Sequence, residues 1–122
     1  MKVLADTSVW IDHFRRGEPQ LVELLRLGEI VIHSAVIGEL ACGSLRRRDQ
    51  ILLELGRLPR LPELDLEEAL RSVEQEKLWG RGLGWTDVIL LGSCRLAGAR
   101  LWTKDRALGT AARDLIRFPL PE

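Results

Sequence analysis

Short apolar runs alternate with helix-forming segments along this chain, and this alternation constrains the fold more than any other feature. Residues 2–5, 30–33 and 99–103 have the length and apolar or β-branched character of strands, and residues 116–118 suit a last short strand. The segments between them carry the apolar spacing of helices. We therefore expect an α/β layer fold with a mostly parallel sheet.

The boundaries of the helices follow from capping residues and helix breakers. A proline near the start of residues 18–27 and Gly28 after them delimit one helix. The helix that begins at residue 34 is expected to run to Gly56 with a break near Gly43, and the proline-bounded segment 57–65 connects it to a helix over residues 66–80. Polar side chains are expected to cap or open the other helices, namely Thr7 or Ser8, Ser34, Thr86 and Asp105.

Length and charge limit the possible partners. The 122 residues are enough for one domain, residues 1–122, and 18 basic side chains balance 18 acidic ones. A nucleic acid would therefore be held by a local basic patch. We expect no signal peptide and no membrane span. Cys42 and Cys94 lie in apolar helical segments and are expected to be buried, reduced thiols of a cytoplasmic protein, with a single disulfide as the alternative.

Three acids lie where helices are expected to begin near the sheet. Asp6 follows the first strand and is the only charged residue between Lys2 and Asp12. Asp105 follows the strand at 99–103, and Asp87 begins the helix before that strand. Each acid can be explained as a helix cap, because carboxylates accept the free N–H groups of a first turn. The ends of parallel strands are also where ligands collect in open sheets.

Glu39 has no such explanation. It lies in the middle of a helix and is the only charged residue between Glu29 and Arg46. Burying an unpaired carboxylate costs several kcal/mol, or forces its protonation, and no Lys or Arg stands three or four positions away to pair with it. Asp87 is equally isolated, between Arg81 and Arg95.

A shared metal ion would neutralise isolated acids together. An all-oxygen ligand set suits a hard ion such as Mg²⁺ or Mn²⁺. Zinc is disfavoured, because His13, His33 and the two cysteines lack its usual ligand spacing. Those histidines are interpreted as a helix-surface residue and a strand-end residue.

The order of four motifs resembles the PIN-domain ribonucleases. The motifs are D-T-S after the first strand, a helical E-L followed by G-x-L, then T-D-V-I-L, then L-W-T-K-D. The likeness covers residues 2–115, and the compact length is similar to the VapC-type toxins of type II toxin–antitoxin pairs. It implies a three-layer sandwich with a central, mostly parallel sheet and an acidic pocket. By this resemblance Asp6, Glu39, Asp87 and Asp105 are the catalytic, metal-site acids, and Thr103 orients them.

The implied chemistry is hydrolysis of RNA phosphodiester bonds by metal-activated water, without a covalent nucleophile. Ser8 is at most a hydrogen-bond donor, since it lacks a His/Asp arrangement. Arg106, Ala107 and Leu108 stand where family members often carry a further acid or aromatic residue. The number of metal ions, and whether Asp105 binds one directly, therefore stay open.

The resemblance also implies partners: an RNA substrate, a cognate antitoxin protein and a second copy of the chain, with no membrane. The leucine-rich helices offer apolar surface for such contacts. Arg46, Arg47 and Arg48 suit either a grip on phosphates or an ordinary solvated helix surface. Trp10 and Trp102 are expected in the core, and the segment WGRGLGW is expected to be a loop.

Other classes fit less well. A phospho-receiver domain needs an acid pair after the first strand, and a haloacid-dehalogenase-type phosphatase needs D-x-D, whereas Asp6 is followed by Thr7 and Ser8. The remaining alternative is a non-catalytic PIN-like module that binds RNA or protein.

Overall fold

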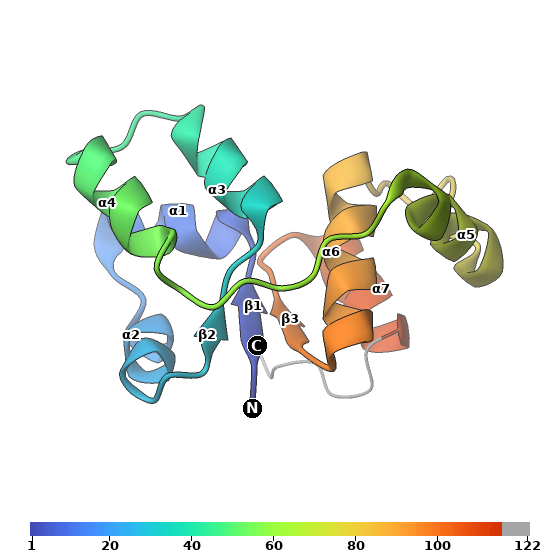
Figure 1. Ribbon diagram of the computed structural model, residues 1–122, viewed down its shortest axis with the longest axis horizontal. Coiled ribbons are helices and arrows are strands. Elements are labelled where there is room, and N and C mark those ends of the chain that lie inside the picture. The colour runs from blue at the N-terminus through green and yellow to red at the C-terminus, as the bar shows by residue number, and fades with distance from the viewer. Residues whose placement is uncertain (116–122) are drawn as a thin grey trace.

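A parallel sheet of three strands forms the centre of the computed structural model, which describes residues 1–115 (Figure 1). β1 (Val3–Ala5) lies between β2 (Ile30–Val31) and β3 (Arg100–Trp102). Both pairings are parallel, and Val3 faces Ile30 on one side and Arg100 on the other. The expected α/β fold with a parallel sheet is confirmed. The strand expected at residues 116–118 lies outside the described residues.

Helices flank this sheet in two groups (Figure 1). The group beside β2 consists of α1 (Thr7–Arg16), α2 (Pro19–Arg26), α3 (Ser34–Ala41) and α4 (Arg48–Leu55). The group beyond β3 consists of α5 (Leu66–Glu76), α6 (Trp85–Ala97) and α7 (Arg106–Leu115). No helix within residues 1–115 combines the length and the apolar character that a membrane crossing requires.

The core joins both groups of helices to the strands. Leu4 and Ala5 of β1 are fully buried, and the helices contribute buried side chains such as Leu21, Val36 and Leu90. A fully buried leucine stabilises the fold by roughly 1.5–3 kcal/mol relative to an exposed one. Trp10 and Trp102 are also buried, as expected.

Several helices begin on a different cap from the one expected. For α1, the cap is Asp6 in place of Thr7 or Ser8, because its backbone is extended and its side chain reaches the N–H of Val9; the helix-cap explanation considered for Asp6 is thereby confirmed. His33 caps α3 in place of Ser34. Gly84 precedes α6 in place of Thr86. Asp105 does open α7, since its carboxylate accepts the N–H of Leu108 at 2.8 Å.

The break expected near Gly43 is confirmed, because α3 ends at Ala41 and α4 starts at Arg48. This ending places Cys42 in an exposed position, so the expectation that both thiols are buried is wrong for Cys42. Cys94 is buried in α6, where burial raises the pKa of its thiol to about 12. Both cysteines are free thiols.

The carboxyl ends of the three parallel strands meet at one edge of the sheet, the upper edge in Figure 1. Asp6 follows β1 there, His33 lies just beyond β2, and Thr103 follows β3. The first turn of α6 reaches the same end of the molecule (Figure 1). The fold therefore collects the ends of elements that are far apart in sequence.

Candidate active site

Asp6 is the most firmly held carboxylate at this edge. Only 6% of the residue is exposed. The Thr103 hydroxyl donates to its Oδ2 at 2.5 Å, and the Ser8 hydroxyl donates to its Oδ1 at 2.5 Å. The N–H of Val9 donates to Oδ1 at 3.3 Å. Asp6 is thus a helix cap, but it is also fixed from β3, which capping does not require.

The electrostatic setting of Asp6 is unfavourable for a bare charge. Burial raises the pKa of this carboxyl above its ordinary value, and the hydrogen bonds from Ser8 and Thr103 oppose that shift without cancelling it. Within residues 1–115, no Lys or Arg forms an ion pair with this carboxylate. A buried, oriented carboxylate of this kind favours a bound cation.

Thr103 connects two of the candidate acids. Its Oγ1 donates to Asp6 and accepts the N–H of Asp105 at 3.0 Å. The carboxylate of Asp105 is exposed and caps α7. The orienting contact expected of Thr103 is therefore present for Asp6, and Asp105 is joined to it through its backbone.

Glu39 lies beside the first residue of α1. Its Oε1 accepts a hydrogen bond of 2.5 Å from the Thr7 hydroxyl, so its carboxylate approaches the chain next to Asp6. The residue is exposed, so the expectation of a buried charge is wrong. Its isolation in the sequence reflects the apolar face on which α3 packs into the core, through Val36 and Leu40.

Asp87 lies in the first turn of α6 and is half-buried. Its Oδ2 accepts the N–H of Gly84 at 2.9 Å, so the carboxylate is turned back onto its own loop. The capping interpretation holds for Asp87 in this conformation.

The four acids do not form a closed set. Within residues 1–115 no three His, Cys, Asp or Glu side chains are placed together to hold a metal ion. The contacts instead form two groups: Asp6, Thr103 and Asp105 in one, and Thr7 with Glu39 beside it. Among these residues, the carboxylate of Asp87 forms a hydrogen bond only with its own loop, at Gly84.

Lys104, which the sequence did not single out, links the segment after β3 to α1 and to the residue before α2. Lys104 donates its backbone N–H to the Ser8 hydroxyl at 3.0 Å. Its ammonium group pairs with Asp12, and with Glu18 at 2.9 Å. These hydrogen bonds raise the pKa of Lys104. The partners lie 92 and 86 residues away, so local patterns carry no signal for them.

The histidines match their expected places. His13 lies on α1, and His33 follows β2. Nδ1 of His33 accepts the N–H of Ala35, so Nε2 carries the proton and donates to the Ser93 hydroxyl at 3.1 Å. Burial lowers the pKa of His33, which favours this neutral form. Neither histidine belongs to a metal cluster in the described part of the chain.

Comparison with known proteins agrees with this architecture. The family model described as PIN domain matches residues 3–114. The chain therefore belongs to the PIN-domain family.

More specific relatives are found in one organism. The chain is 49% identical over 113 residues to ribonuclease VapC32 from two strains of Mycobacterium tuberculosis, CDC 1551 / Oshkosh and ATCC 25618 / H37Rv. The match covers 92% of this chain and 91% of that protein. The resemblance to VapC-type PIN ribonucleases is thereby confirmed.

A solved structure supports the fold alone. The crystal structure of PAE2754 from Pyrobaculum aerophilum superimposes with a TM-score of 0.63 at 18% identity, and covers 97% of both chains.

Proposed function

We propose that this chain, as one PIN-like domain over residues 1–122, is a divalent-metal-dependent endoribonuclease and the toxin of a type II toxin–antitoxin pair. Membership of the PIN-domain family and the 49% identity to a protein named ribonuclease VapC32 support the ribonuclease activity. The observation that carries the site is Asp6, a buried carboxylate aligned by hydroxyl groups from two different elements.

The candidate donor set suits Mg²⁺ or Mn²⁺. Asp6, Glu39 and Asp87 would hold the ion, with Asp105 as a further ligand or as the group that orients a water. All their donor atoms are carboxylate oxygens, which hard cations prefer. Glu39 and Asp87 are each held by one hydrogen bond and are at least partly open to solvent, so neither carboxylate is locked in its present position. When bound, the ion supplies charge neutralisation at the phosphate and a more acidic water.

The other residues of the site position these acids. Thr103 and Ser8 donate to opposite oxygens of Asp6, which fixes the plane of its carboxylate. The Lys104 backbone fixes the Ser8 hydroxyl in turn. Hydrogen bonds of this kind orient a metal ligand and sharpen the affinity of the site.

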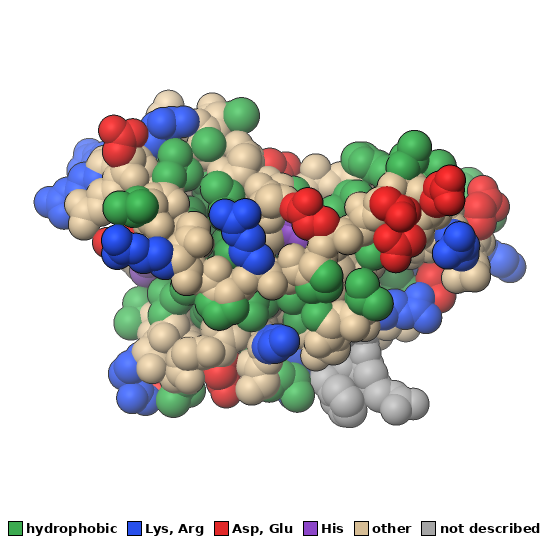
Figure 2. Space-filling model, viewed as in Figure 1, with side chains coloured by type: hydrophobic (Ala, Val, Ile, Leu, Met, Phe, Trp, Pro, Cys, Tyr) green, Lys and Arg blue, Asp and Glu red, His purple; other side chains and the backbone are tan. Residues whose placement is uncertain are grey.

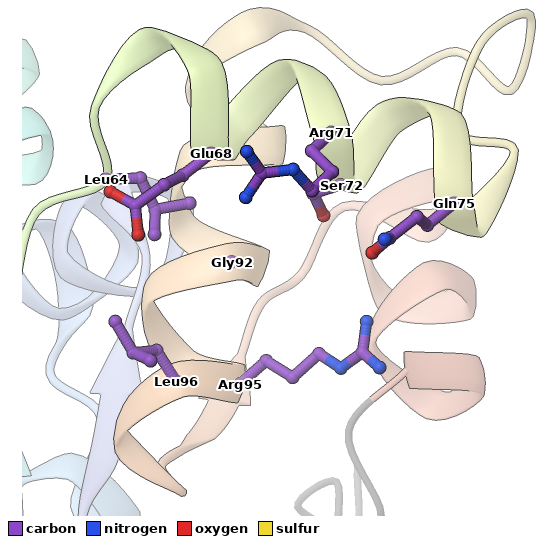
Figure 3. Close-up of a pocket in the computed structure, with 8 residues that line it drawn as sticks. All are labelled: Leu64, Glu68, Arg71, Ser72, Gln75, Gly92, Arg95 and Leu96. Atoms are coloured by element: carbon purple, nitrogen blue, oxygen red, sulfur yellow. The ribbon is translucent and has the colours of Figure 1, made fainter.

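Partners follow from the same proposal. The substrate is RNA, the restraining partner is a cognate antitoxin, and the toxin is a homodimer in the cytoplasm. Apolar surface supports protein contacts: Leu70 is exposed on α5, and Leu96 is exposed on α6, where it lines a groove of about 350 Å³ (Figure 3). Leu64 lines the same groove and packs against Gly92, where a Cβ would clash with it. Light scattering that finds only monomer at high concentration would contradict the dimer.

A cleavage assay tests the activity. The purified chain should cut RNA in Mg²⁺ or Mn²⁺, leave 5′-phosphate ends and stop in EDTA. Undiminished cleavage in EDTA would contradict the metal requirement. RNA binding without cleavage in any divalent metal would favour the non-catalytic binding module instead.

A further inference from the structure

Three consecutive arginines, Arg46, Arg47 and Arg48, form an exposed turn between α3 and α4, here named the arginine turn. Within residues 1–115, the guanidinium groups of Arg46 and Arg47 have no hydrogen-bond or ion-pair partner. Cations such as Arg26, Arg95 and Lys104 are by contrast paired with carboxylates. Arg48 forms an ion pair with Asp49 at 3.7 Å, so the unpaired positive charge of the arginine turn lies on Arg46 and Arg47.

The turn is held in place by its third arginine. Arg48 donates from Nε and Nη2 to the carbonyl oxygen of Ala41, at 3.2 and 3.0 Å. Ala41 is the last residue of α3, so these two bonds tie the turn to the end of that helix. The side chain of Arg48 therefore has a structural role, while the side chains of Arg46 and Arg47 are exposed on a turn that these bonds hold in place.

The end of α3, to which the turn is tied, also carries a candidate active-site acid. Glu39 lies two residues before Ala41, about 3 Å along the axis of α3. The carboxylate of Glu39 contacts Thr7, which follows Asp6 directly. A continuous series of contacts therefore runs from Asp6 through α3 to the arginine turn.

The segment around the arginine turn is basic, and the segment that follows it in the sequence is acidic. Residues 42–60 contain five arginines and two acids, whereas residues 61–76 contain six acids and one arginine. Figure 2 shows blue side chains gathered on the left, over α4 and the turn before it, and red ones on the right over α5. A polyanion would approach this neutral protein on the α3–α4 side.

We propose that the arginine turn binds the phosphate backbone of the RNA strand and holds it across the end of α3, beside the candidate active site. Arg46 and Arg47 make the phosphate contacts, and Arg48 is a positioning residue. The inference rests on the proposed ribonuclease function, but it concerns how the strand is held and not how it is cut.

Binding measured without cleavage tests this directly. The full chain is titrated into fluorescently labelled single-stranded RNA in EDTA, at several salt concentrations, and anisotropy gives Kd. Two phosphate contacts on a single strand contribute about 1.4 to the slope of log Kd against log salt concentration. The double substitution Arg46→Gln with Arg47→Gln should lower the slope by about that amount and raise Kd. In the cleavage assay it should raise KM and leave kcat unchanged.

A matched control removes the same charge elsewhere. Lys2→Gln with Lys77→Gln changes two exposed cations, before β1 and after α5, that form no ion pair within residues 1–115. This variant should keep the salt slope and KM of the unmodified protein. The charge-preserving pair Arg46→Lys with Arg47→Lys should retain most of the slope. A loss of slope in the control equal to that in the arginine variant would overturn the inference, because only net charge would then matter.

A further variant separates binding from folding. Arg47 has a φ of 53°, in the left-handed region that favours glycine. Arg47→Gly should therefore melt no lower than the unmodified protein, yet bind RNA more weakly. Unchanged RNA affinity and salt slope in the Gln pair would overturn the inference, and would point to a protein partner for the turn. Cleavage could persist in that case, so this failure is distinct from failure of the proposed function, which shows as the absence of metal-dependent cleavage.

Discussion

The candidate acids can be compared as two groups, Asp6 alone and Glu39 with Asp87, and these groups are held very differently. Asp6 is buried and receives donors from α1 and from the segment after β3, whereas Glu39 and Asp87 each accept one hydrogen bond and are more open to solvent. The first group is preorganised by the fold. The second keeps the rotational freedom with which it can close around a ligand. The contrast teaches that the fold fixes the position of Asp6, whereas the positions of Glu39 and Asp87 depend on weaker, local contacts.

The largest expected effect is on Asp6. Asp6→Asn should reduce RNA cleavage by more than about 100-fold, because positioning contacts alone are worth about 10–100-fold and Asp6 is a proposed ligand. The metal-free fold should not be weakened, since Asn caps a helix as well as Asp and carries no buried charge. Thermal melting in EDTA and in excess Mg²⁺ measures this. Mg²⁺ should raise the melting temperature of the unmodified protein more than that of Asp6→Asn.

The prediction fails if Mg²⁺ raises the melting temperature of both proteins equally and Asp6→Asn melts lower than the unmodified protein in EDTA. The comparison of Asp6 with the other acids would then have no functional meaning. Asp6 would then act only as a helix cap and would not be a metal ligand.

The next effect tests how Asp6 is held. Thr103→Val should lower activity by about 10–100-fold and reduce the free energy of unfolding by about 1–3 kcal/mol, because a buried carboxylate loses a donor. Thr103→Ser keeps the hydroxyl and should restore most of both. Denaturant unfolding and the cleavage assay measure the pair. If Thr103→Val keeps activity and stability while Thr103→Ser loses them, the methyl group rather than the hydroxyl matters, and the preorganisation argument fails.

The free energy of unfolding should depend on pH differently in the unmodified protein and in Asp6→Asn. Because burial raises the pKa of Asp6 above its ordinary 3.8, the folded state binds the proton more tightly than the unfolded state. The stabilising contribution of protonated Asp6 is fully present below 3.8 and is lost as pH rises through the folded pKa. The stability advantage of Asp6→Asn in EDTA should therefore grow over that range. If the difference in the free energy of unfolding between the two proteins stays constant with pH in EDTA, the prediction is wrong.

The smallest expected effect is on the loosely held group. Glu39→Gln should change the free energy of unfolding in EDTA by less than about 0.5 kcal/mol, as for other exposed substitutions. Its effect should appear only with metal, as a smaller Mg²⁺-dependent rise in melting temperature. A destabilisation in EDTA as large as that of Thr103→Val would show that both groups are structural.

Local patterns predicted the strands and most helices because their signals are short in range. Apolar runs and helix breakers act within a few residues, so the parallel sheet and the break after α3 were both predictable. Capping was predicted less well, because the cap depends on where the backbone leaves the strand. Asp6 therefore takes the place expected for Thr7 or Ser8.

The sequence nominates the candidate site residues by type and order, but it does not predict their environment. Glu39 looked buried because its neighbours are apolar, yet those neighbours face the core and leave it outside. The ties between Thr103 and Asp6, and between Lys104 and Asp12, join residues more than 90 positions apart. Only the assembled sheet brings such residues together, so neither contact has a local signature.

The bond from Thr103 to Asp6 spans 97 residues, and this separation sets an order of events during synthesis. Asp6 leaves the ribosome 97 residues before its donor, which emerges only when β3 and the segment after it have been made. Until then the aspartate lacks the contact that aligns it, and β1 lacks one of its two neighbouring strands. A nascent chain that stops before Thr103 therefore holds Asp6 without one of its two hydroxyl donors, and the candidate site is assembled only after that residue has left the ribosome.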